Sequence, residues 1–176
     1  GQHLDLDFEG RSSVTQQNYL RMVEAKTASL LAASAVAGAR VAKAPEALVE
    51  SYRSFGRNLG IAFQIYDDVL GIWGDPQVTG KPAGDDLLAH KISYPVLIGL
   101  QHSQAFVELW TSGRTDSPAL QSMMQALAEA GAADRSREAA QQHSVRAEDS
   151  LSSASPLEPA GHLVRQLIQD LLLRVR

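Results

Sequence analysis

Two adjacent aspartates, Asp67 and Asp68, interrupt an otherwise apolar stretch of the sequence, FQIYDDVLGIW. Carboxylates are costly to bury unless hydrogen bonds or cations compensate their charge. Together with Gln64 and Gly71, they follow the spacing i, i+3, i+4 and i+7, so the four residues share one face of a helix. Such a face beside a flexible loop suits Mg²⁺, which prefers carboxylate oxygens and takes further ligands from water and phosphate. The alternative interpretation is a face that is solvated or paired with arginine.

Two lysines lie in settings that could bind a phosphate. Lys81 stands in a loop rich in glycine and proline, TGKPAGDDL, where it could clamp a phosphate or simply be solvated. The loop is not a P-loop, because proline follows the lysine where serine or threonine is required and because a predicted helix precedes it. Lys26 lies beside Thr27 in an apolar segment. It either extends its ammonium group to solvent or forms a diphosphate-binding pair with the threonine hydroxyl.

The elements that must position these residues are all predicted to be helices. Apolar residues recur at helical spacing after Ser12, Ser13 and Thr15, whose hydroxyls could cap the first of these helices. The helix that carries the aspartates is apolar on nearly all sides, which is typical of a central helix. No alternating run rich in Val, Ile and Thr indicates a sheet, so the predicted fold class is all-α. The predicted helices span 19–42, 45–72, 93–110, 118–130, 132–152 and 159–176, with a glycine- and proline-rich loop after the second.

The composition limits the possible functions. The 176 residues carry a formal net charge of −4, which argues against a broad nucleic-acid-binding surface. The sequence has no cysteine, which rules out disulfides and thiolate metal sites and is compatible with a reducing compartment. No apolar run is long enough to span a bilayer. The histidines show no metal-ligand spacing: His3, His90, His102, His143 and His162.

Five segments resemble, in order and spacing, the motifs of the trans-isoprenyl diphosphate synthases, the polyprenyl synthetase family. They are GQHLDLDFE at 1–9, YLRMVEAKTASLL at 19–31, FQIYDD at 63–68, TGKPAGDDL at 79–87 and KISYP at 91–95. The resemblance implies a helical bundle of the isoprenoid synthase type without its N-terminal helices. Residues 1–176 would then be the C-terminal part of a single all-α domain. The start at Gly1, without an initiator methionine, fits a longer parent protein.

The resemblance also implies a reaction. In this family Mg²⁺ bridges aspartates to an allylic diphosphate, which ionises to a carbocation that isopentenyl diphosphate attacks. By motif, Asp67 would hold one Mg²⁺ with support from Asp68. The resemblance also implies that Lys26 and Lys81 neutralise the diphosphate and that Lys91 assists them. Thr27 and Gln64 would donate hydrogen bonds near the diphosphate. Gln2 would lie beside the allylic chain. A cytoplasmic homodimer acting on prenyl diphosphates, without nucleic acid, is expected.

Two departures from the family pattern leave alternatives open. Gly71 stands where a third aspartate of the motif would lie, and the family's first aspartate-rich motif precedes the first residue of this chain. Asp85 and Asp86 are expected in a loop and do not replace that first motif. A terpene cyclase-like enzyme and a non-catalytic subunit of a heteromeric synthase remain possible. The terminal LLLRVR could place Arg174 or Arg176 near a diphosphate, although cations at a helix end also have a simpler electrostatic explanation.

Overall fold

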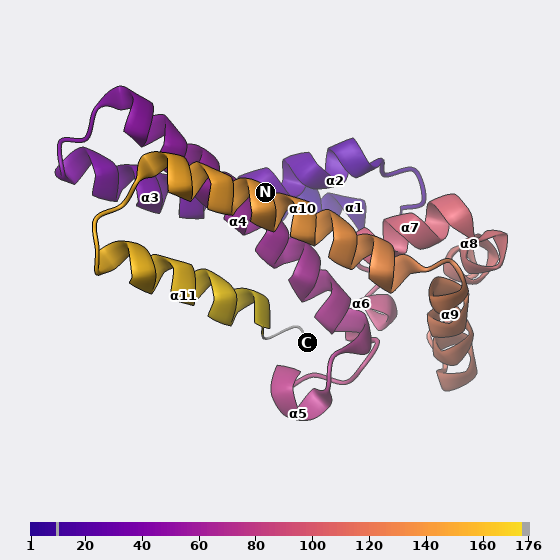
Figure 1. Cartoon of the computed structure of the whole chain (residues 1–176). Helices are drawn as coiled ribbons and strands as arrows, with labels where there is room; N and C mark the ends of the chain where they lie inside the picture. Colours follow the sequence, from indigo (N-terminus) through magenta and orange to yellow (C-terminus); the bar gives the residue numbers. More distant parts are fainter. Residues whose placement is uncertain (10, 174–176) are drawn as a thin grey trace.

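The long helix α4 (Glu46–Trp73) runs through the centre of the molecule in the computed structural model, which describes residues 1–9 and 11–173. Helix α10 (Ala132–Ala154) packs along it, and α3 (Ser29–Val41) lies beside its N-terminal half (Figure 1). Thirteen residues of α4 are buried, among them Leu59, Ile65 and Ile72. The prediction of a central helix is therefore confirmed.

Every regular element within the described residues is a helix, which confirms the all-α fold class. Besides α3, α4 and α10, the elements are α1 (Gln2–Phe8), α2 (Gln16–Val23), the π-helical turn η1 (Glu24–Ala28), α5 (Pro76–Thr79), α6 (Asp85–Leu88), α7 (Tyr94–His102), α8 (Gln104–Thr111), α9 (Ser117–Glu129) and α11 (Ala160–Leu173). The predicted arginines Arg174 and Arg176 lie outside the described residues.

The first long helix differs from its prediction. It begins at Gln16, because the Thr15 side chain accepts a hydrogen bond from the Asn18 N–H, and Asn18 reciprocates in a capping box. It is then interrupted by η1, which a search for regular helical spacing cannot detect because a π turn differs from an α-helix by one residue. Lys26 and Thr27 both lie in this turn. Its position at two predicted site residues agrees with the frequent occurrence of π turns at functional sites.

Two other segments also differ from prediction. The helix expected over 93–110 is divided at Ser103, whose extended backbone ends α7 and whose hydroxyl accepts a hydrogen bond from the Phe106 N–H to cap α8. The loop after Gly74 contains the short helix α5, which Asp75 caps, and residues 80–84 connect it to α6. Asp85 and Asp86 therefore begin a helix instead of lying in irregular loop.

The buried side chains form a large and a small core. The large core surrounds the C-terminal half of α4 and includes Tyr19, Ile65, Leu97 and Trp110. The small core joins the N-terminal half of α4 to α10 and α11 through Phe55, Leu59, Ala147, Leu151 and Ile168. The larger core anchors the end of α4 that carries the two aspartates, so it is the part of the fold that holds the candidate site in place.

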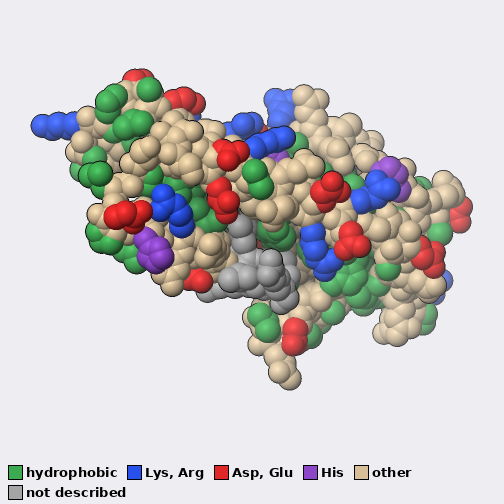
Figure 2. All heavy atoms as spheres, viewed as in Figure 1, with side chains coloured by type: hydrophobic (Ala, Val, Ile, Leu, Met, Phe, Trp, Pro, Cys, Tyr) green, Lys and Arg blue, Asp and Glu red, His purple; other side chains and the backbone are tan. Residues whose placement is uncertain are grey.

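Basic and acidic side chains are interspersed on the face of the molecule seen in Figure 2. Among the helices that the structure describes, none has the length and apolar character needed to cross a membrane. Several large apolar side chains are exposed, including Leu6 on α1 and Leu30 and Val41 on α3.

Candidate active site

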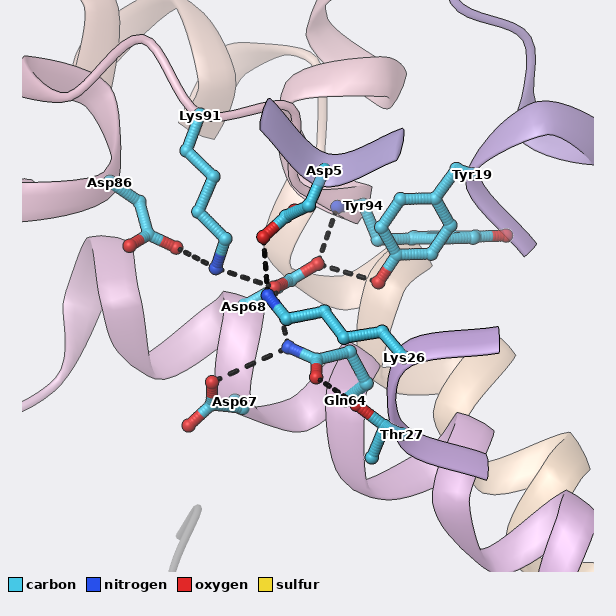
Figure 3. A network of polar contacts seen from close by, with 10 residues as sticks. All are labelled: Asp5, Tyr19, Lys26, Thr27, Gln64, Asp67, Asp68, Asp86, Lys91 and Tyr94. Atoms are coloured by element: carbon cyan, nitrogen blue, oxygen red, sulfur yellow. Dashed lines mark hydrogen bonds and ion pairs between the residues drawn. The ribbon is translucent and has the colours of Figure 1, made fainter. Parts of the chain in front are cut away.

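Asp68 is the centre of a buried hydrogen-bond network (Figure 3). Its side chain is almost fully buried, with 1% relative exposure. One carboxylate oxygen accepts hydrogen bonds from the Tyr19 hydroxyl at 2.6 Å and the Tyr94 backbone N–H at 2.9 Å. The other accepts from Lys91 Nζ at 3.1 Å and from Gln64 Nε2 at 3.2 Å. Four donors and one positive charge thus compensate the burial of this carboxylate.

The partners of Asp68 come from three different parts of the chain. Tyr19 belongs to α2, Lys91 precedes α7, and the Tyr94 N–H is one of the unpaired donors at the N-terminus of α7, where a negative charge is favourable. Burial raises the pKa of Tyr19 well above its usual value, and the adjacent Asp68 raises it further, so the hydroxyl stays protonated as a donor. Asp68 therefore fastens α2 and α7 to α4.

Asp67, by contrast, is exposed and only loosely held. Gln64 Nε2 lies 3.4 Å from one of its carboxylate oxygens, and no hydrogen bond to the other is found among the described residues. Gln64 in turn accepts a hydrogen bond from the Thr27 hydroxyl at 2.9 Å. This chain of contacts links the π turn to the exposed carboxylate of Asp67 and fixes which end of the Gln64 amide faces the aspartates.

A cavity of about 240 Å³ opens beside Asp67, between the last turns of α4 and the segment that follows them. Its lining contains two carboxylates and two ammonium groups, from Asp67, Asp86, Lys81 and Lys91, together with Phe63, Tyr66, Leu70, Gly71, Val78, Thr79 and Pro82. Lys81 is exposed, and its ammonium group has no ion pair within the described part of the chain. The cavity could therefore receive a ligand that carries both a cation and an anion, such as a metal-bound phosphate.

Lys91 is held between two carboxylates. Its Nζ lies 3.1 Å from Asp68 and 2.9 Å from Asp86. Burial alone would lower the pKa of Lys91, but the negative charges of Asp68 and Asp86 outweigh it and raise this pKa above its usual value. The lysine is therefore a fixed positive charge at the inner end of the cavity.

Lys26 reaches the same network from η1 and forms an ion pair with Asp5 of α1. In Figure 3 its ammonium group lies in front of Asp68 and Gln64. The cavity is not lined by Lys26, Thr27 or Gln64. The contact between Gln64 and Asp67 connects this group of residues to the cavity. The structure thus gathers Lys26, Thr27 and Gln64 beside Asp67 and Asp68 but outside the cavity that Lys81 lines (Figure 3).

Gln2 is the one predicted site residue that the structure leaves apart. It is exposed in the first turn of α1 and does not line the cavity. The sequence analysis assigned no role to Asp5 or Asp86, and both are ion-pair partners of predicted lysines. Each lies inside a segment that carried the family resemblance, so a charge search within those segments could have found them. The contribution of Tyr19 and of the Tyr94 backbone had no signal in the sequence.

The donors present suit a partly hydrated hard cation. Within the described residues, no group of three or more His, Cys, Asp or Glu side chains is arranged to hold a metal ion. Mg²⁺ commonly binds to one or two carboxylates and takes its remaining ligands from water and substrate phosphates. The open carboxylate of Asp67 fits this mode, whereas the oxygens of Asp68 are already occupied by four donors.

Comparison with known proteins gives consistent results. The family described as polyprenyl synthetase matches residues 1–129. The chain is 47% identical over 110 residues to a geranylgeranyl diphosphate synthase of Mycobacterium tuberculosis. The aligned region covers 62% of this chain and 31% of the relative. The chain therefore spans about a third of the length of that curated relative.

Two solved structures share the fold. A decaprenyl diphosphate synthase from Rhodobacter capsulatus has a TM-score of 0.89 and 29% identity, covering 99% of this chain and 55% of the other. A geranylgeranyl pyrophosphate synthase from Corynebacterium glutamicum, complexed with isoprenyl diphosphate and magnesium, has a TM-score of 0.89 and 25% identity. The match covers 98% of this chain and 51% of the other. The sequence match, the shared helical fold and the aspartate–lysine site agree: the chain belongs to the polyprenyl synthetase family.

Proposed function

We propose that these residues form the C-terminal part of a single all-α domain in a longer trans-prenyl diphosphate synthase, here termed the parent protein. The parent protein would condense an allylic prenyl diphosphate with isopentenyl diphosphate to give a longer linear diphosphate. The observation that carries this proposal is the exposed carboxylate of Asp67 in a cavity that Lys81 and Lys91 also line. Family membership over residues 1–129 supports the same reaction class.

The diphosphate is the group that these side chains suit. Its C–O bond to the allylic carbon breaks, the electron pair leaves with the diphosphate, and the double bond of isopentenyl diphosphate attacks the resulting cation before a proton is lost. Lys81, which is exposed and unpaired within the described residues, is free to turn toward the charge that develops on the leaving group. Lys26 would join it by exchanging Asp5 for a phosphate oxygen. Lys91, already fixed by two carboxylates, adds positive charge at the inner end.

Asp67 would hold Mg²⁺, which neutralises negative charge on the diphosphate when bound. The crystallised Corynebacterium relative, with isoprenyl diphosphate and magnesium, supports the choice of ion. Asp68 would support the site through its hydrogen bonds to Gln64 and Lys91. Since the donors of Thr27 and Gln64 are engaged within the protein, we assign them first to orienting Asp67 and only then to the diphosphate. Gln2 is retained as the residue beside the allylic chain.

We further propose a cytoplasmic homodimer. The dimer is supported by α1, in which no residue is fully buried and Leu6 is 66% exposed. An exposed apolar side chain on a helix that has no fully buried residue is a reasonable surface for a second copy.

The parent protein, supplied with labelled isopentenyl diphosphate and an allylic primer, tests the proposed reaction. Elongated diphosphates are expected. A hydrocarbon or alcohol would instead indicate a terpene cyclase-like enzyme. If product forms only after a different chain is added, the protein is a non-catalytic subunit. Such a subunit has no physical need for Asp67, Lys26 and Lys81.

A further inference from the structure

Gly71 lies one helical turn beyond Asp67 on the same face of α4, and the space in front of it is filled by Asp86. A Cβ placed at residue 71 would be 2.4 Å from Asp86 Oδ2 and 2.5 Å from its Cγ. Heavy atoms cannot approach this closely without moving. The carboxylate of Asp86 thus occupies the place into which a side chain at residue 71 would extend.

The position of Asp86 is fixed by the return of the chain onto the end of α4. Gly84 adopts a left-handed conformation, with φ of 80°, and its N–H donates to the Ile72 carbonyl at 3.0 Å. This places the first turn of α6 against α4. The Asp86 backbone carbonyl then accepts from the Lys91 N–H at 3.0 Å, and its side chain binds Lys91 Nζ at 2.9 Å. The residue is buried, with 8% relative exposure.

We propose that Asp86 supplies the third carboxylate of the aspartate-rich motif, taking from α6 the place that an aspartate at residue 71 would have on α4. The inference rests on the proposed function, because it concerns the same cation. Asp67 and Asp86 line one cavity, so a Mg²⁺ ion bound to Asp67 would have a second carboxylate near it. Asp86 would provide an oxygen acceptor either for the ion or for water in its coordination shell.

The balance of charge in the cavity favours this role over simple pairing with lysine. Asp68 already neutralises Lys91, and Asp86 is a second carboxylate on the same ammonium group. Asp67 brings the carboxylates at the cavity and directly behind it to three, against the two ammonium groups of the half-buried Lys91 and the exposed Lys81. A cation bound in the cavity would relieve the excess of negative charge.

A reciprocal exchange of residues tests the proposal in the parent protein. The probe is Mn²⁺ with inorganic pyrophosphate, and the Mn²⁺ affinity is measured by electron paramagnetic resonance. Asp86→Asn is expected to weaken binding about 10- to 100-fold, the range for groups that orient a metal site. The double variant Gly71→Asp with Asp86→Gly is expected to recover most of the lost affinity, because the aspartate at residue 71 then supplies the carboxylate from α4 instead of α6. Asp85→Asn is the matched control, since Asp85 does not line the cavity, and it should bind as the wild type does.

The outcomes separate this inference from the proposed function. Should Asp67→Ala bind Mn²⁺ and pyrophosphate as tightly as the wild type, the proposed function itself fails. If Asp67→Ala loses binding while Asp86→Asn keeps it, only the role of Asp86 is overturned. A double variant that keeps the wild-type helical circular dichroism and thermal midpoint but does not recover affinity also overturns it. Recovery in that variant is a result that a purely structural Asp86–Lys91 pair does not explain.

Discussion

Gly60 of α4 lies against Ala28 so closely that a Cβ at residue 60 would be 2.5 Å from the Ala28 Cα. This contact brings the π turn onto α4, one turn before Gln64, and so allows the Thr27 hydroxyl to reach the Gln64 amide at 2.9 Å. The approach of two backbones, permitted by the missing side chain, therefore connects the Lys26–Thr27 pair to the aspartates.

Gly60→Ala is expected to separate η1 from α4 and to destabilise the protein by about 1–3 kcal/mol, as overpacking does. Urea unfolding followed by circular dichroism measures the change. Gly38→Ala is the matched control, because a Cβ at that helical position of α3 meets nothing within 4 Å. That substitution should raise stability by about 0.5–1 kcal/mol through helix propensity. Equal effects of the two substitutions would show that the close contact is not important.

Asp67 and Asp68 should separate into one residue for function and one for stability. Asp68→Asn removes the charge that Lys91 and the Tyr94 N–H face in a buried site, and a loss of about 3 kcal/mol or more is expected. Asp67→Asn, at an exposed position, should change the free energy of unfolding by no more than about 0.5 kcal/mol. Denaturant titration of both variants checks this. Similar losses for the two would contradict the division of roles.

His143 is expected to make stability depend on pH. Its Nδ1 lies 2.9 Å from Asn58 Oδ1, between α10 and α4. Burial lowers the pKa of His143, Arg146 and Arg57 lower it further, and Glu24 opposes them. The folded state therefore takes up this proton less readily than the unfolded state. The contribution of His143 to stability is present above its unfolded pKa of about 6.5 and is lost as the pH falls through and below it.

The measurement is thermal unfolding of the wild type and His143→Gln between about pH 5.5 and 7.5, on either side of that pKa. The variant should gain relative to the wild type as the pH falls. His102→Gln, at an exposed position on α7, is the control and should follow the wild type. A constant difference between wild type and His143→Gln across the range would exclude a titration of His143.

The 176-residue chain by itself is expected to associate. Leu30 and Val41 on α3 are 69% and 84% exposed, and α1 has no buried residue, so apolar surface is available to a second copy or to an N-terminal half. Sedimentation velocity should show a species larger than a monomer, and the primer assay should give negligible product. A stable, active monomer would show that the parts of the relatives that this chain does not cover are not needed for catalysis.

The sequence was sufficient to predict the fold class and to name most of the residues that the structure gathers at the candidate site (Figure 3). The helical spacing around Leu59 and Ile65 indicates that α4 is central, and the order of the motifs is what relates Lys26, Lys81 and Asp67 to one site. It could not show that Asp68 is enclosed by Tyr19 and the Tyr94 N–H, because these partners are 49 and 26 residues away.

The role of Asp86 was missed for a related reason. Sequence spacing relates only residues along one helix. The carboxylate that fills the space in front of Gly71 belongs to Asp86 of α6, which a left-handed turn at Gly84 brings against α4. The π turn at Lys26 was not predicted either, since it is only five residues long and the segments on both sides of it have ordinary helical spacing.

The central claim is that Asp67 holds the metal for diphosphate ionisation, and the most direct measurement is the Mg²⁺-dependent turnover of Asp67→Ala in the parent protein. Loss of a metal ligand should remove several kcal/mol of transition-state stabilisation, so kcat should fall by about 10²-fold or more at saturating Mg²⁺. Asp134→Ala, at an exposed aspartate in the first turn of α10, should retain wild-type turnover. Turnover of Asp67→Ala near that of the wild type at saturating Mg²⁺ would contradict the assignment of this residue and of the site built around it.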